Sequence, residues 1–93
     1  MTDLSTAFSS DLELMQLLGG RLKALRKDQG LTLEEAGERA SVNKSTVVQA
    51  EKGRNPTLLT VLRLLRVYGR VGAITGFIPE PTVSPLELAR RRG

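Results

Sequence analysis

The side chains best able to do chemistry in this sequence lie between positions 43 and 54. Cysteine and histidine are absent from the chain, which removes thiol chemistry and the commonest general base and metal ligand. No pair of carboxylates suggests an acid–base pocket, so no enzyme activity, cofactor or metal is expected. The polar side chains that remain can form hydrogen bonds at a surface. The outward residues of the segment are Lys44, Ser45, Thr46, Val48, Gln49 and Lys52, none of them acidic.

These residue types match the groups that base pairs expose in the major groove of DNA. Lys44 can donate to guanine O6 and N7, Gln49 can pair with adenine N6 and N7, and Val48 can contact a thymine methyl group. The solvated face of an ordinary amphipathic helix carries the same residue types, however. The pattern by itself leaves both interpretations open.

Capping and periodicity signals predict the helices that would position this segment. Ser10 and Thr32 each begin a capping box, and Asn43 and Thr57 are N-cap residue types before further apolar-periodic runs. Two short helices joined by a three-residue turn have the geometry of a helix-turn-helix, whose second helix enters the major groove. The predicted helices span residues 11–29, 33–40, 43–52 and about 58–68, with the turn at Ser41-Val42-Asn43.

The C-terminal third of the chain leaves more than one structure open. Residues 71–78 are apolar and could form a short helix, whereas their β-branched residues and glycines also allow a strand. We expect this segment to form a dimer interface, with packing against the chain's own helices as the alternative. Ser84 begins a predicted final helix over about 85–91. On the fourth helix, the apolar residues at helical spacing are Leu58, Val61, Leu62, Leu65 and Tyr68.

Charge is distributed unevenly along the chain. Residues 1–20 carry a net charge of −3, whereas residues 21–93 hold all fourteen basic residues against seven acidic ones and carry +7. A basic body favours a polyanionic partner such as nucleic acid. A solvated basic surface is the alternative, and the row Arg63, Arg66 and Arg70 is interpreted mainly in that way. No secretory signal or membrane-spanning stretch is evident, so we expect a cytoplasmic, nucleoid-associated protein.

Several spaced motifs between residues 18 and 70 resemble the Xre-type, lambda-repressor-like helix-turn-helix family. The motifs that carry the resemblance are Leu25-Arg26, Gly30-Leu31-Thr32, Val42-Asn43-Lys44-Ser45-Thr46-Val47, Glu51-Lys52-Gly53 and Pro56-Thr57. The resemblance implies an all-α, five-helix domain that binds near-palindromic double-stranded DNA as a homodimer, here with a short C-terminal helical extension. We expect a flexible tail (1–10), a helix-turn-helix DNA-binding domain (11–78) and a C-terminal extension (79–93).

The resemblance also assigns roles position by position. Arg26 and Glu51 match a structural ion pair between the first and third helices. The base-contacting positions are Lys44, Ser45, Val48 and Gln49, and the DNA-backbone positions are Asn43, Thr46, Lys52 and Arg54. The departures from the family pattern are Leu33 for the usual Gln, Ala36-Gly37 for Leu-Ala, Ser41 for the turn Gly and Val48 for the common Ser. Ser41 therefore needs either a positive φ or a different turn.

Three functional hypotheses follow from these features. The first is a transcriptional regulator, most simply a dimeric repressor that places residues 43–52 in the major groove. The alternative is the antitoxin of a type II toxin–antitoxin pair, which also represses its own promoter and contacts a toxin protein through residues 71–93 or the acidic N-terminal segment. The third is a helix-turn-helix scaffold that binds only protein, which the basic face at Lys44 and Lys52 disfavours.

Overall fold

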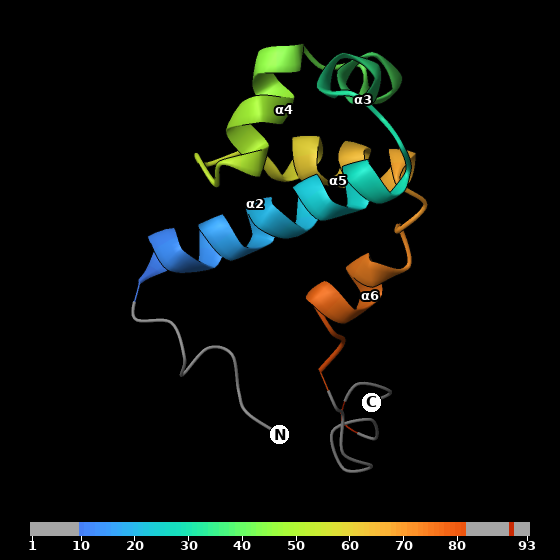
Figure 1. Ribbon diagram of the computed structural model, residues 1–93. Coiled ribbons are helices and arrows are strands. Elements are labelled where there is room, and N and C mark those ends of the chain that lie inside the picture. The colour runs from blue at the N-terminus through green and yellow to red at the C-terminus, as the bar shows by residue number, and fades with distance from the viewer. Residues whose placement is uncertain (1–9, 82–89, 91–93) are drawn as a thin grey trace.

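The computed structural model describes residues 10–81 and Arg90, and every regular element in that part of the chain is helical (Figure 1). The helices are α2 (Asp11–Asp28), α3 (Leu33–Ala40), α4 (Lys44–Glu51), α5 (Leu58–Val67) and α6 (Ala73–Phe77). The predicted all-α, five-helix fold is confirmed, and the segment 71–78 contains a short helix. Residues 1–9 of the predicted tail lie outside the described residues, as does the predicted helix over 85–91 apart from Arg90.

The five helices pack unequally. α3 packs against α4 and α5, and α2 packs against α4. In Figure 1, α3 and α4 lie on one side of α2, whereas α6 lies on the other. α6 buries none of its residues. No described helix combines the length and the apolar character that crossing a bilayer requires.

Hydrogen bonds at the helix starts confirm three of the predicted caps. The Ser10 hydroxyl accepts a backbone amide in the first turn of α2 at 3.2 Å, and the Thr57 hydroxyl accepts one in α5 at 3.1 Å. Thr32 forms the full capping box of α3, because its Oγ1 accepts from the Glu35 amide (3.1 Å) and the Glu35 carboxylate accepts from the Thr32 amide (3.0 Å). The hydrogen bonds to Thr32 lower the pKa of the Glu35 carboxyl. These local bonds explain why α2, α3 and α5 begin where they do.

Asn43 differs from the other three caps. It occupies the N-cap position of α4, with φ −69° and ψ 152°, but its side chain makes no capping hydrogen bond. The predicted N-cap position of Asn43 is confirmed, but its exposed side chain does not supply the capping bond. The Asn43 carbonyl accepts hydrogen bonds from the amides of Thr46 (3.0 Å) and Val47 (3.2 Å) in the first turns of α4.

The core lies among α2, α3, α4 and α5. The buried residues of α5 are Thr60 and Leu64, and Tyr68 at its C-cap is buried too, whereas Leu58 is 54% exposed. Of the apolar residues noted at helical spacing in the sequence, Tyr68 is buried, whereas those from Leu58 to Leu65 form a second, less buried face of α5. The buried apolar residues are Leu22, Leu31, Ala36, Ala40, Val47, Ala50, Leu64 and Tyr68.

A buried ion pair joins α2 to the last residue of α4. Arg26 Nε donates to Glu51 Oε2 at 2.6 Å and Arg26 Nη2 donates to Glu51 Oε1 at 3.1 Å. Arg26 Nη1 donates to the Leu31 carbonyl at 2.9 Å, which ties in the connection between α2 and α3. The side chains of Arg26 and Glu51 are only 9% and 7% exposed, and the hydrogen bond to Glu51 raises the pKa of Arg26. The pair that the resemblance implies is thus bidentate, the geometry with the greatest orientational specificity.

Tyr68 lies in the electrostatic field of this ion pair. Its side chain is 1% exposed, and its hydroxyl has no hydrogen-bond partner among the described residues. Burial raises the pKa of Tyr68 to about 12, and the charge of Glu51 acts in the same direction. Tyr68 therefore stays neutral near pH 7 and supplies packing volume beside the ion pair without adding a third charge.

Gly19 allows α2 to approach the backbone of α4. A β-carbon at position 19 would lie 2.5 Å from the carbonyl oxygen of Glu51 and 2.7 Å from that of Ala50. At position 20 a β-carbon would meet nothing within 4 Å. The two adjacent glycines therefore have different roles, and only Gly19 is required by the packing of the helices.

Alanine substitutions at these two glycines should have opposite effects on stability. Gly20→Ala should stabilise the protein by about 0.5–1 kcal/mol, because alanine is the better helix former and meets no obstacle. Gly19→Ala should destabilise it by about 1–3 kcal/mol, because α2 and α4 must move apart. Urea-induced unfolding of both variants measures the difference. Equal effects at the two positions would contradict the close approach of α2 to α4.

Candidate nucleic-acid interface

The outer face of α4 presents the four predicted base-contacting residues together. Lys44 and Ser45 are exposed, and Val48 and Gln49 are half-buried one turn further along the same side. The opposite side of the helix is anchored in the core, because Val47 is 0% exposed and Ala50 is 1% exposed. The rotation of α4 about its axis is therefore fixed by packing, which leaves the outer side chains in a defined orientation.

The predicted backbone-contacting residues flank this face at both ends. Asn43 is exposed before α4, Lys52 and Arg54 are exposed after it, and Thr46 is half-buried between them. The turn after α4 rests on α2, because a β-carbon at Gly53 would lie 2.6 Å from the Met15 carbonyl oxygen. Gly53 also has a φ of 70°, which favours glycine. Lys52 and Arg54 therefore project from a turn whose position is set by α2.

Three of the predicted contact residues already have partners within the protein. Lys44 Nζ lies 3.5 Å from Glu34 Oε1, with both side chains more than half exposed. Arg54 Nη1 donates to Gln49 Oε1 at 3.4 Å. Both interactions are long and exposed, so each is weak and DNA can displace it. Glu34 was missed as part of this surface; in the sequence it shows only as an acidic residue suited to the start of a helix.

Three of the departures from the family pattern lie on α3 and in the turn that follows it. Ser41 adopts φ 59° and ψ 41°, so the chain keeps the left-handed turn conformation without a glycine, at a cost of roughly 1–2 kcal/mol. Leu33 is half-buried and packs against the core, so it does not offer the polar side chain that the family usually has there. A β-carbon at Gly37 would lie 2.8 Å from the Val42 carbonyl oxygen, which shows how closely this turn folds onto α3.

Comparisons with known proteins place this arrangement in a family. Residues 17–73 match the family described as a helix-turn-helix domain. An uncharacterised HTH-type transcriptional regulator of Methanothermobacter thermautotrophicus is 46% identical over 46 residues, which cover 48% of this chain and 67% of that protein. A second uncharacterised HTH-type transcriptional regulator, from Sinorhizobium fredii, is 32% identical over 59 residues, which cover 62% of this chain and 77% of that protein. No solved structure shows a significant match.

The matched region contains the helix-turn-helix unit and most of the helices that hold it in place. It includes most of α2 and all of α3, α4 and α5, together with the ion pair between Arg26 and Glu51. α3, the turn at Ser41 and α4 form a helix-turn-helix unit held against α2 and α5. The match covers more than half of the chain, and the chain belongs to the helix-turn-helix domain family.

Proposed function

We propose that this protein is a sequence-specific, DNA-binding transcriptional regulator that acts as a homodimeric repressor and places α4 in the major groove. The observation that carries the proposal is the outer face of α4, where Lys44, Ser45, Val48 and Gln49 share one side of a helix whose other side is buried. Lysine and glutamine at these positions have the donors and acceptors that distinguish guanine and adenine. The names of the two relatives support a role in transcription for proteins of this kind.

The surroundings of α4 suit the DNA backbone. Lys52 and Arg54 lie after the helix, where their charges can neutralise phosphates. At the other end, no side chain caps the first turn of α4. The Thr46 amide bonds to the Asn43 carbonyl, which leaves the amides of Lys44 and Ser45 and the positive end of the helix dipole available to a phosphate oxygen. The outer face of α4 would thus contact bases, and the two ends of the helix would contact phosphates.

Repression is the simplest regulatory outcome for such a protein, because a dimer bound across a promoter excludes polymerase. Footprinting on the DNA upstream of the protein's own gene would identify a first operator. We expect two protected half-sites with centres about 10 bp apart, the spacing at which two recognition helices lie on the same side of the duplex. A protected site inside the promoter supports repression, whereas protection outside it with increased transcription would contradict it.

The base-contacting and backbone-contacting roles should separate in a binding assay. Lys44→Ala or Gln49→Ala should cost about 1–3 kcal/mol on the operator and relax the preference at particular base pairs. Lys52→Ala should weaken binding to all sequences alike and reduce the salt dependence of binding. For the wild-type dimer, about six to eight neutralised phosphates give a slope of about −5 to −7 in log affinity against log salt. Titrations against single-base operator variants at several salt concentrations make both measurements.

The melting temperature of each variant is the control, since loss of folding would weaken binding to every sequence. A uniform loss for Lys44→Ala and Gln49→Ala, together with altered base preference for Lys52→Ala, would mean that α4 docks differently. A wild-type slope near zero would contradict DNA binding through phosphate neutralisation.

A groove between α2, α5 and α6 supports the dimer. It has a volume of about 490 Å³, and its walls include Leu18 of α2, Leu62 and Leu65 of α5, and Ile74 and Phe77 of α6. Phe77 remains 57% exposed even though it lines the groove. Such a concentration of exposed apolar side chains on a small protein is characteristic of an interaction surface. We propose that the corresponding surface of a second copy covers it, with residues 71–88 as the main contact.

Substitution of Phe77 should separate the dimer. Phe77→Glu places a charge in the proposed interface, and operator binding should then weaken by about tenfold or more because two half-sites are no longer held together. Leu59→Glu is the matched control, because Leu59 is 56% exposed and does not line the groove. Sedimentation should show a monomer for Phe77→Glu and a dimer for Leu59→Glu. If the dimer persists in Phe77→Glu, or in a variant truncated after Arg70, the proposed interface is wrong.

A further inference from the structure

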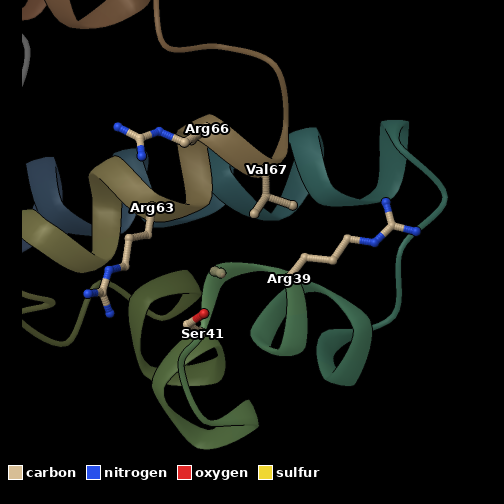
Figure 2. Close-up of a pocket in the computed structure, with 6 residues that line it drawn as sticks. Arg39, Ser41, Arg63, Arg66 and Val67 are labelled. Carbon is tan, nitrogen blue, oxygen red and sulfur yellow. The ribbon is translucent and has the colours of Figure 1, made fainter.

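A second pocket lies on a different face of the molecule, between the C-terminal end of α3 and α5 (Figure 2). Its volume is about 460 Å³. Ala40 is buried and Val67 is half-buried, so these two side chains form an apolar floor. The remaining lining residues are Ser41, Arg39, Arg63 and Arg66, all exposed. None of the six belongs to the proposed DNA contacts or to the apolar groove.

The three arginines of this pocket have no carboxylate partner in the described part of the chain. The ion pairs formed within residues 10–81 join Arg26 to Glu51 and Lys44 to Glu34. Glu35 lies one turn before Arg39 on α3, and its hydrogen bonds to Thr32, helped by the charge of Arg39, lower the pKa of its carboxyl. That carboxylate accepts from the Thr32 amide, however, and forms no ion pair with Arg39. Glu38, next to Arg39, is exposed and forms no ion pair within the same residues. The rim of the pocket therefore carries three positive charges, none of them in an ion pair within the described residues, and Glu35 offsets only that of Arg39.

The directions of the arginine side chains indicate the shape of a suitable ligand. Figure 2 shows Arg63 and Arg66 leaving α5 in different directions, and Arg39 extending away from both. The three guanidinium groups do not converge on one point, so a single small anion would not satisfy them. A peptide segment with carboxylates on both sides of an apolar side chain fits better, since each carboxylate can meet a separate arginine. A phosphate backbone offers the anions but has no apolar group for the floor.

We propose that this arginine pocket is a docking site for an acidic segment of a protein partner. An apolar side chain of that segment covers Ala40 and Val67, while its carboxylates pair with Arg39 on one side and with Arg63 on the other. Guanidinium groups bind carboxylates through two parallel hydrogen bonds, and arginine is enriched at protein interfaces. The proposal does not depend on the DNA-binding role, because it uses a separate set of residues.

A titration with a synthetic peptide of alternating glutamate and leucine tests the proposal on the full-length protein. The backbone amide NMR signals of Ser41 and Val67 should shift, whereas those of Lys44 and Gln49 should not. The double variant Arg39→Ala/Arg63→Ala should bind the peptide at least about tenfold more weakly. Lys23→Ala/Lys27→Ala removes the same charge from exposed positions of α2 and should change the affinity by no more than about twofold, as expected for screened charges at a distance.

Two further comparisons keep the result interpretable. Arg39→Lys/Arg63→Lys retains both charges and should still bind more weakly, because lysine lacks the bidentate geometry. A peptide with serine in place of leucine should also bind more weakly, because it cannot fill the apolar floor. Equal losses of affinity for Arg39→Ala/Arg63→Ala and for Lys23→Ala/Lys27→Ala would overturn the proposal. So would a duplex of unrelated sequence that shifts the Ser41 and Val67 signals in the same way, since the surface would then bind phosphate.

Discussion

The position of α4 depends on the buried ion pair between Arg26 of α2 and Glu51 at the end of that helix. The pair is bidentate and nearly inaccessible to solvent, so a change in the angle between α2 and α4 would break hydrogen bonds that water cannot replace. Gly19 brings the two backbones into contact beside the pair. The N-terminal end of α4 is held separately, by the left-handed turn at Ser41. With both ends fixed, the outer side chains of α4 need little reorganisation to bind a ligand.

A domain of this size cannot bury all of its apolar surface. In this protein one part of that surface forms the core and another part lines the groove. One face of α5, centred on Leu64, completes the core against α3. The other face, with Leu62 and Leu65, lines the groove together with residues of α2 and α6, and α6 buries none of its own residues. The groove is lined in part by α6, and in Figure 1 α6 and the α3–α4 unit lie on different sides of α2. A second copy could therefore complete the apolar face without covering the surface proposed to bind DNA.

The sequence predicted the features that depend on local interactions. The starts of α2, α3 and α5 were correct because each cap is a hydrogen bond within a few residues of the chain. Features that depend on the angles between helices could not be predicted from the sequence. Periodicity on α5 marks two apolar faces and does not say that Thr60 and Leu64 are the buried ones. Likewise, the proximity of Glu34 to Lys44 follows from how α3 meets α4, and nothing in the sequence distinguishes Gly19 from Gly20.

The most direct test of the account is the sequence specificity of Glu51→Gln, a variant that weakens the ion pair without touching the outer face of α4. Affinity for the operator and for an unrelated duplex is measured at one salt concentration, at a temperature where the variant is folded. We predict that operator affinity falls by about tenfold or more as α4 loses its fixed orientation. Affinity for the unrelated duplex should hold or rise slightly, because a negative charge is removed. Equal changes in the two affinities would contradict the claim that this ion pair positions α4 for DNA recognition.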